Sequence, residues 1–330
     1  MGRINGTVIK WSRRCDEFFW KRTNHAHNGQ KGQMTMIDLG EGFREWTQDQ
    51  AAQRLIRTFM DDADFDPAYS LGRIGSLEVR LAATKTEIKK AQSLRFKVFY
   101  EEMHATPDLI SRLKRRDIDP FDTHCDHLLV LDHKDNKPKV IGTYRLLRQN
   151  MAARGCGFYT ASEFDIAPML AAHPAARFLE LGRSCVLKAY RDKRTVELLW
   201  HGIWTYVRRH KIDIMFGCAS LSGTDPEALA LPLSFLHHTA RAEGILAAKP
   251  VSGRAINMNL MGSDMIDARK ALHALPPLIK GYLRLGARFG DGAVIDRQFG
   301  TTDVLVILPV SAINPRYIDY YGEDATRYAA

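Results

Sequence analysis

The stretch RFLELGRSCVLKAYRDKRTVELLWHGI, residues 177–203, joins the pattern of a buried strand to a basic loop and a helix. Two charged residues, Glu180 and Arg183, interrupt its apolar half. A carboxylate in an apolar strand is costly unless it is paired or used in chemistry, because burial removes its hydration. The loop half then brings together four cations just before the helix: Lys188, Arg191, Lys193 and Arg194. Because backbone N–H groups and the helix dipole favour anions at that point, the loop is predicted to bind a phosphate.

Strand and helix patterns alternate along the rest of the chain. Five further segments have the alternation or the apolar runs of strands: 76–84, 127–133, 139–147, 213–221 and 301–310. Residues 135–138 read as a hairpin turn, so we expect the two strands that flank them to be antiparallel neighbours. A capping box that begins at Thr84 starts a helix pattern that runs to Met103, and a second helix pattern covers 225–241. This order predicts an α/β fold with a central mixed, mostly antiparallel sheet flanked by helices.

Length and charge set the broad class of the protein. Its 330 residues are 45% hydrophobic and 26% charged, as in ordinary globular proteins. We expect an N-terminal extension over 1–75, partly helical or disordered, one large domain over 76–315 and a tail over 316–330. The net charge of +9 implies an acidic partner, which could be nucleic acid, anionic lipid or an acidic protein. Because no stretch approaches the ~20 apolar residues of a membrane span and no secretory signal begins the chain, we expect a cytoplasmic protein.

Two motifs near residue 127 suggest other chemistry, and simple geometry argues against both. His127 and Asp132 have the H-x-x-x-x-D spacing of glycerolipid O-acyltransferases, but on a regular strand they point to opposite faces. Cys125 and its histidine and aspartate neighbours suggest zinc, yet consecutive residues cannot converge on one tetrahedral ion. The five cysteines include no CxxC pair, so we expect reduced thiols and no metal site.

Four motifs follow one another in the order found in the acyl-homoserine-lactone synthases: LRFKVFYEEM (94–103), DIDPFDTHCDHLLVLD (117–132), VIGTYRLL (140–147) and FLELGRSCV (178–186). Together with the element order, they resemble those enzymes and imply a fold like that of the Gcn5-related N-acetyltransferases. Met103 and His104 stand where the lactone synthases have a tryptophan, which weighs against a lactone product.

The C-terminal part of the chain resembles a narrower group. Residues 275–310, LPPLIKGYLRLGARFGDGAVIDRQFGTTDVLVILPV, are similar to the hemolysin-like L-ornithine N-acyltransferases. The resemblance implies that a 3-hydroxyacyl chain is moved from acyl carrier protein to the α-amine of L-ornithine, which gives lyso-ornithine lipid. It implies no metal and no bound cofactor, because the phosphopantetheine arm arrives with the carrier protein, and no nucleic acid partner.

The same motifs imply a binding site for the acceptor. Its expected members are Arg95, Phe99, Asp119, Asp122 and Arg145. An amino acid needs such a mixture, since acids bind its ammonium groups and an arginine binds its carboxylate. The alternative is a structural network of salt bridges among the same charges.

The strand 178–186 is expected to supply the reaction chemistry. Glu180, directly or through water, would accept a proton from the ornithine ammonium so that the nitrogen can attack the thioester; the alternative is that it only pairs with an arginine. Arg183 would face away from Glu180 on an ideal strand, and a bulge at Gly182 could turn it back. We expect neighbouring strands to splay apart, so that a backbone N–H near Cys185 or Val186 stabilises the oxyanion.

The basic loop is the expected donor site. Lys188, Arg191, Lys193 and Arg194 would bind the phosphopantetheine or the carrier protein, and a second cluster completes the docking face: Arg112, Lys114, Arg115 and Arg116. The loop lacks the glycine-rich pattern with which most acetyltransferases of this fold hold coenzyme A, whereas the single phosphate of phosphopantetheine needs less of that cradle. Either cluster could instead be solvated surface or touch anionic lipid, which would place the protein peripherally at the inner face of the cytoplasmic membrane.

Two other functions stay open on the sequence. An acyl-homoserine-lactone synthase would release thiol with S-adenosylmethionine in place of ornithine. A membrane-binding, hemolysin-like protein without catalysis would use the basic amphipathic segment 276–290 at a lipid surface.

Overall fold

The computed structural model describes residues 68–314, 316 and 317. The expected N-terminal extension and C-terminal tail lie almost entirely outside the described residues. The sheet already begins at Ser70, ahead of the domain boundary expected at Ser76. This first strand has a glycine at its centre, and it joins the next strand through a tight turn at Gly75, where φ is +60°. Glycine adopts this left-handed conformation without the steric cost that other residues meet.

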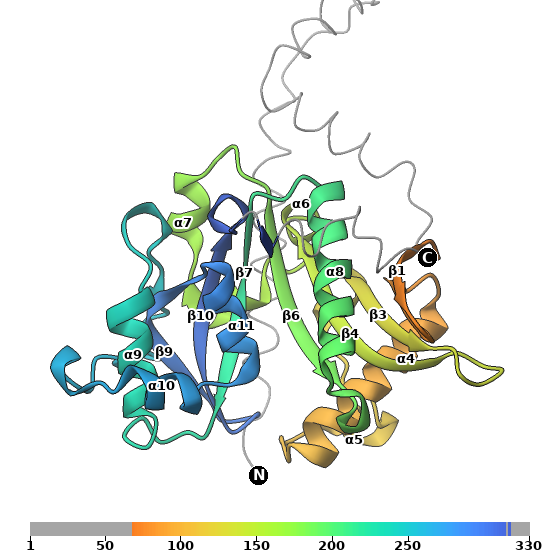
Figure 1. Ribbon diagram of the computed structural model, residues 1–330, viewed down its shortest axis with the longest axis horizontal. Coiled ribbons are helices and arrows are strands. Elements are labelled where there is room, and N and C mark those ends of the chain that lie inside the picture. Colours follow the sequence, from red (N-terminus) through yellow and green to blue (C-terminus); the bar gives the residue numbers. More distant parts are fainter. Residues whose placement is uncertain (1–67, 315, 318–330) are drawn as a thin grey trace, which may run out of the picture. The chain divides into compact units, whose positions relative to one another are not determined.

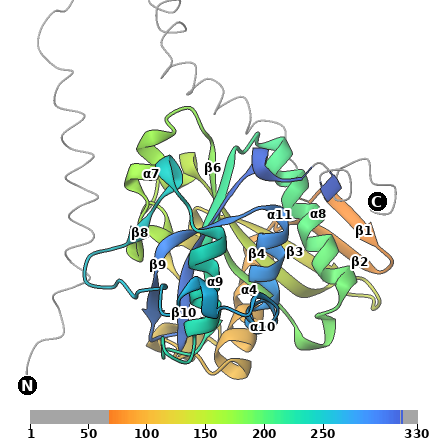
Figure 2. The ribbon, with the colours of Figure 1, turned by 60° about the vertical axis from the view of Figure 1, so that its left-hand side comes forward.

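One eight-stranded sheet organises the fold (Figure 1, Figure 2). Its strands lie in the order β1-β2-β3-β4-β6-β7-β10-β9, and only the pair β6–β7 is parallel. The predicted mixed, mostly antiparallel sheet is therefore confirmed, as is the hairpin between β3 and β4. The strands are β1 (Ser70–Ile74), β2 (Leu77–Leu81), β3 (Asp126–Asp132), β4 (Lys139–Arg148), β6 (Phe178–Val186), β7 (Ile214–Ser222), β9 (Arg288–Asp296) and β10 (Thr301–Pro309). A separate small sheet pairs β5 (Phe164–Asp165) with β8 (Lys249–Pro250).

Helices cover both faces of the large sheet. On one face, α8 (Lys193–Arg209) packs against β1 to β4, while α9 (Ala230–Ala240) and α11 (Pro277–Leu285) pack on β9 and β10. On the other face, α4 (Lys85–Phe96) packs against β3, β4 and β6. Figure 1 shows α8 and α11 in front of the sheet and α4 behind it. Among the described helices, none is long and apolar enough to cross a bilayer.

The remaining helical segments are short. They are α5 (Leu109–Lys114), α6 (Gln149–Ala152), α7 (Ala167–Ala172), α10 (Ala268–Ala274), the π-helical η1 (Lys97–Glu102) and the 3₁₀ turns η2 (Pro120–Thr123), η3 (Tyr159–Ser162), η4 (Lys188–Tyr190), η5 (Gly244–Leu246), η6 (Ser263–Met265) and η7 (Val310–Ala312).

The predicted N-cap Thr84 starts α4, but the second bond of the predicted capping box comes from Ala83 instead of Thr84. Thr84 Oγ1 accepts a hydrogen bond from Glu87 N (3.2 Å), and Glu87 Oε2 accepts one from Ala83 N (2.8 Å). The helix predicted to run to Met103 continues without a break to Glu102, but it changes from α-helix to the π-helix η1 at Lys97. The second predicted helix, α9, begins only at Ala230 instead of near residue 225.

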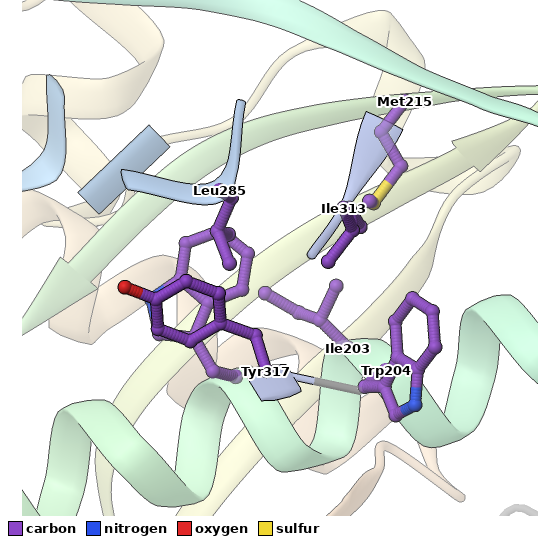
Figure 3. A pocket seen from close by; sticks show the side chains of 7 residues that line it. Ile203, Trp204, Met215, Leu285, Ile313 and Tyr317 are labelled. Carbon is purple, nitrogen blue, oxygen red and sulfur yellow. The ribbon is translucent and has the colours of Figure 1, made fainter. Parts of the chain in front are cut away.

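The sheet divides the core into two sides. Hydrophobic side chains on the α8 side also line a pocket (Figure 3): Trp200, Ile203, Trp204, Met215, Leu285, Ile313 and Tyr317. Met215 is the residue that β7 contributes there, whereas its neighbours Ile214 and Phe216 belong to the core on the opposite side. The sheet thus separates this apolar pocket from the charged side chains of the other face.

β6 and β7 run side by side only at their beginnings. Residues 178–180 pair with residues 214–216, and beyond them β6 pairs only with β4 and β7 only with β10. The two strands then diverge, as Figure 1 shows. At the point of divergence the carbonyl oxygen of Leu181 approaches Gly217 so closely that a Cβ there would lie 2.2 Å from it. The expected splay of neighbouring strands is confirmed, and we refer to the opening between β6 and β7 as the gap.

Candidate active site

A row of buried polar side chains crosses the face of the sheet opposite α8. It includes Arg145 of β4, Glu180 of β6 and Asp303 of β10, all of them at most 5% exposed. Each is followed along its strand by a residue of the core beneath α8: Leu146, Leu181 and Val304. Because successive side chains on a strand point to opposite faces, the three charged residues share the face that carries α4 and η3.

Three arginines and three aspartates form one ion-pair network at the β4 and β6 end of this row, which we call the arginine–aspartate cluster: Arg95, Arg145, Arg183, Asp117, Asp119 and Asp122. Arg95 joins Asp117 and Asp122, with both N–O distances 2.8 Å. Arg145 joins Asp119 (2.5 Å) and Asp122 (3.2 Å), and Arg183 joins Asp117 (3.2 Å) and Asp119 (3.4 Å). The six formal charges cancel, so much of the predicted acceptor site is a salt-bridge network, which was the alternative interpretation of these residues.

Burial differs within the arginine–aspartate cluster. The side chains of Arg95 and Asp122 are 1% and 4% exposed, whereas those of Arg183 and Asp119 are 14% and 15% exposed. Burial alone would raise the pKa of Asp122, but the charges of Arg95 and Arg145 outweigh it and hold the pKa below its usual range. Arg95 and Asp122 are therefore shielded from solvent, while Arg183 and Asp119 are the more exposed members of the cluster.

A bulge in β6 places Arg183 in this cluster. Arg145 lies opposite Gly182 and Thr143 lies opposite Cys185, so β6 has one more residue than β4 between these pairs. The predicted bulge is confirmed, but the left-handed residue is Arg183 itself, with φ of +51°, and not Gly182. Such a conformation is uncommon outside glycine and asparagine, and it turns the side chain away from its regular direction.

Aromatic rings hold the Arg183 guanidinium on two sides. Its centre lies 4.9 Å from the ring of Tyr159 and 5.0 Å from the ring of Phe299. Phe99, a predicted substrate-binding residue, packs edge-on against Phe299 with ring centres 5.7 Å apart. Phe99 therefore lies behind Phe299 and supports the position of Arg183.

Glu180 binds the backbone of η3 and not an arginine. Its Oε1 accepts a hydrogen bond from Thr160 N (2.7 Å) and its Oε2 accepts one from Tyr159 N (3.0 Å). Burial nevertheless raises the pKa of this carboxyl, because the hydrogen bonds compensate only part of the lost hydration. Glu180 therefore fixes η3 to β6, and its raised pKa brings it closer to the range in which a carboxylate exchanges protons.

The backbone at the end of β6 distinguishes between the two predicted oxyanion donors. Leu187 N donates to Ile141 O of β4 (2.9 Å). Since hydrogen-bonded residues alternate along an antiparallel pair, the N–H of Cys185 also faces β4, whereas that of Val186 points toward the gap. The geometry favours Val186 as a donor. The Cys185 side chain is buried, and burial raises the pKa of its thiol, as expected for a packing residue.

The basic loop differs from the predicted phosphate site. Asp192 caps α8, with its Oδ1 accepting a hydrogen bond from Thr195 N (2.9 Å), so the chain itself satisfies this helix terminus. Arg191 forms a bidentate ion pair with Glu102 of η1, with Nη1–Oε1 and Nη2–Oε2 distances of 2.5 and 2.9 Å. The phosphate site was predicted from cations beside free backbone N–H groups at a helix start. Asp192 occupies one of these groups, and anion binding by the loop stays a prediction.

Exposed cations remain at this end of the gap. The exposed side chains of the two basic clusters are Lys188, Arg191, Lys193 and Arg194, together with Arg112, Lys114 and Arg115, while Arg116 is half-buried. Arg115 also pairs with Glu101 of η1, which ties α5 to the same region as the Arg191–Glu102 pair.

His127 and Asp132 take different partners, as their opposite directions on β3 predicted. His127 Nε2 lies 3.0 Å from Asp122 O, while Asp132 accepts hydrogen bonds from Ser76 Oγ (2.7 Å) and the Tyr190 hydroxyl (2.9 Å).

A second charged group on the same face was missed in the sequence. Carboxylate oxygens of Glu163, Asp296 and Asp303 lie within 4.8 Å of one another, and all three residues are buried. Burial and the neighbouring Asp303 raise the pKa of Glu163 to about 7. One signal was available, since Asp303 interrupts an apolar strand as Glu180 does. We call this group the acidic trio; it is also the only group of carboxylate, histidine or cysteine ligands with metal-binding spacing among the described residues.

A domain family matches part of this chain. The family model of the acetyltransferase (GNAT) domain matches residues 94–201. Among solved structures, an N-acyl amino acid synthase from uncultured soil microbes aligns with a TM-score of 0.41 and 13% identity, over 71% of this chain and 91% of that one.

Sequence relatives are much closer. An L-ornithine N(alpha)-acyltransferase of Agrobacterium fabrum is 56% identical over 259 residues, which cover 78% of this chain and 88% of the relative. A protein of the same name from Rhodobacter capsulatus is 40% identical over 250 residues, covering 74% and 95%. The protein is therefore an acyltransferase with a GNAT domain, and it belongs to the L-ornithine N(alpha)-acyltransferase family.

Proposed function

We propose that this protein transfers a 3-hydroxyacyl chain from acyl carrier protein to the α-amine of L-ornithine and so makes lyso-ornithine lipid. The observation that carries the acceptor is the identity of 40% to 56% with relatives named for Nα-acylation of ornithine. The geometry supports an amino-acid acceptor, because Arg183 and Asp119 present charges of both signs beside the gap. An amino acid carries both signs as well, so each of its charged groups meets a partner.

In the proposed mechanism, the acceptor carboxylate binds Arg183 and its α-ammonium gives a proton to Glu180, directly or through water. The neutral nitrogen attacks the thioester carbonyl, and the Val186 N–H donates to the resulting oxyanion. As the tetrahedral intermediate collapses, the C–S bond breaks and the new C–N bond remains. The nitrogen loses its second proton, and the sulfur leaves as the phosphopantetheine thiol.

The proposed donor is supported by the position of the exposed cations. The loop 187–194 follows directly on the end of β6, where the gap is open, and the Arg191–Glu102 pair fixes it to η1. Acyl carrier protein is acidic around its phosphopantetheine serine, so a basic rim at this end would orient it with the thioester toward the gap.

A peripheral membrane contact also belongs to the proposal. The side chains of Leu109, Ile110 and Leu113 on α5 are largely exposed beside Arg112 and Lys114. Exposed apolar groups next to cations are typical of surfaces that touch anionic lipid, which suits an enzyme whose product is an amphiphile.

Purified protein tests the function directly. With 3-hydroxyacyl carrier protein and L-ornithine, we expect thiol release and a product with the mass of Nα-acylornithine. S-adenosylmethionine in place of ornithine should give no release, and acyl coenzyme A should be a poorer donor. Thiol release with S-adenosylmethionine alone, or no release with ornithine, would overturn the proposed reaction.

A further inference from the structure

The acidic trio is assembled from three separate parts of the fold. Glu163 follows η3, Asp296 ends β9 and Asp303 lies in β10, and their residues are 3%, 9% and 5% exposed. Within the described part of the chain, none of these carboxylates has a lysine or arginine nitrogen within 4.0 Å. Three buried acids this close repel one another when all are ionised, so the arrangement costs stability unless one of them is protonated or a cation joins it.

One oxygen of the trio lacks any partner. Glu163 Oε2 is buried and makes no hydrogen bond. By contrast, Asp303 Oδ1 accepts from the Thr301 hydroxyl (2.8 Å), and Asp296 Oδ1 accepts from the backbone of the turn 297–299. A buried carboxylate oxygen that finds no donor in the protein is expected to find one in a ligand.

The trio lies beside the reaction site and not in a separate part of the molecule. Glu163 comes directly after the turn whose N–H groups Glu180 holds, and Cys218 Sγ of β7 lies 3.7 Å from Thr160 Oγ1 of that turn. Asp303 is paired with Ser220 on β7, the strand that forms the far wall of the gap. The positive charge of Arg183 reaches Asp303 and lowers its pKa, although burial raises that pKa more. The gap therefore has the arginine–aspartate cluster on its β6 side, and on its β7 and β10 side it has three carboxylates that form no ion pair with a described lysine or arginine.

We propose that the acidic trio binds the side-chain ammonium of the amine acceptor. This inference rests on the proposed function, since ornithine carries a second ammonium at the end of its side chain. An ammonium has three N–H donors, which match three carboxylates, and the trio offers few ligands for Mg²⁺ or Ca²⁺, which take six to eight oxygens. With the carboxylate on Arg183 and the side-chain ammonium in the trio, the α-amine is the nitrogen left at the thioester. The trio would then determine both the choice of a diamino acid and the position that is acylated.

The test compares two acceptors that differ only in the side-chain ammonium: L-ornithine and L-norvaline. In the wild-type protein kcat/KM should favour ornithine. Asp303→Asn and Glu163→Gln should lower that preference roughly 30-fold or more, the usual effect of truncating one partner of a buried charge pair. Asp165→Asn, which removes an exposed carboxylate two residues from Glu163, is the matched control and should leave the preference unchanged.

Thermal unfolding gives a second readout that does not depend on turnover. Ornithine, but not norvaline, should raise the Tm of the wild-type protein, and this rise should disappear in Asp303→Asn. Without ligand, the two trio variants should unfold at or above the wild-type temperature, because they remove repulsion between buried acids.

Three outcomes would overturn the assignment of the trio. If both variants keep the wild-type preference for ornithine, the side-chain ammonium binds elsewhere. If the purified wild-type protein carries one equivalent of a divalent metal that is lost in Asp303→Asn, the trio binds that metal. If norvaline raises the Tm as much as ornithine, the trio does not bind the side-chain ammonium. A wild-type protein that acylates no ornithine at all would instead contradict the proposed function.

Discussion

Two carboxylates that interrupt apolar strands, Glu180 and Asp303, look alike in the sequence and differ in their surroundings. Glu180 receives two backbone hydrogen bonds, so its burial is compensated and it holds η3 in place. Asp303 shares its buried environment with two further acids and lacks a compensating cation. Since an uncompensated buried charge is the one that a ligand can stabilise, we propose substrate recognition for Asp303 and its neighbours, and both support of η3 and proton transfer for Glu180.

We expect Glu180→Gln to lower turnover on the order of a hundredfold or more, because an amide cannot accept the proton. The same change should cost about 1–3 kcal/mol of unfolding free energy, since the new NH₂ group faces a backbone donor. Measured kcat at saturating substrates, together with the unfolding free energy, separates the two effects.

Leu147→Val is the control for that variant. Leu147 is buried opposite Glu180 on β4, and the loss of one methylene there lowers the free energy of unfolding by about 1 kcal/mol. The substitution leaves the proposed proton acceptor unchanged. If Glu180→Gln and Leu147→Val lose the same small amount of turnover, Glu180 is structural and the base lies elsewhere.

The pKa of Glu163 gives a pH dependence with a defined sign. Below about pH 7 its carboxyl is protonated, and above it the ionised form adds a charge that binds an ammonium. The titratable and charged groups that face Glu163 are Asp303, Asp296, Cys218, Arg254 and Tyr159. The preference for ornithine over norvaline should therefore rise as the pH increases through about 7.

The ratio of kcat/KM values for the two acceptors is the right measurement. Well below the pKa of either α-ammonium, the fraction of free amine rises by the same factor with pH in both acceptors, so this dependence cancels in the ratio. In Glu163→Gln the ratio should be independent of pH. A ratio that is flat in the wild-type protein, or that still rises in the variant, would exclude Glu163 as the titrating group.

Strands and loops show which features a sequence specifies locally. The strand pattern of residues 127–133 and 139–147 is a local feature of the sequence, so the β3–β4 hairpin could be predicted. The bulge in β6 could be predicted as well, because a glycine precedes Arg183. The donor role of the basic loop stays a prediction, and its sequence interpretation did not consider Asp192, which lies among the cations. Asp192 is itself an N-cap residue, and side-chain capping satisfies a helix terminus without a ligand.

The close approach of β6 and β7 where they begin to diverge requires Gly217, and this is testable. A Cβ at residue 217 would meet the Leu181 carbonyl, which is backbone and cannot rotate away. We expect Gly217→Ala to cost about 1–3 kcal/mol of stability, as overpacking does in a closely packed interior.

Gly281→Ala provides the matched control. Gly281 lies inside α11, and a Cβ there meets no atom within 4 Å. Because alanine favours the helix, the same substitution should raise the free energy of unfolding by about 0.5–1 kcal/mol. Urea unfolding of both variants measures whether each substitution lowers or raises the free energy of unfolding. Equal stability of Gly217→Ala and the wild-type protein would show that β6 and β7 can separate further without loss.

At the scale of the whole molecule, the sheet brings together residues that the sequence keeps far apart. Glu163 and Asp303 are neighbours only because β7 pairs with β10 and η3 folds back over β6 and β7. No local pattern contains that information, which is why the motif-bearing half of the site was predictable and the acidic trio was not. The motifs contained Arg95, Asp119, Asp122, Arg145, Glu180 and Arg183, and also Asp117, whose place in the network only the structure reveals.

The last prediction concerns the carrier protein and the rim of the gap. Lys193 and Arg194 are exposed at the start of α8, and rim charges mainly set the rate of association and its dependence on salt. Changing both to glutamate should lower kcat/KM for acyl carrier protein on the order of tenfold at low salt and flatten its salt dependence, while kcat at saturating donor changes less. Lys89 and Lys90, exposed on α4, give a control in which the same reversal alters net charge equally. If that control slows the reaction as much, the attraction comes from overall charge and the rim has no special place in docking; if salt leaves the wild-type rate untouched, the donor is not an acidic protein.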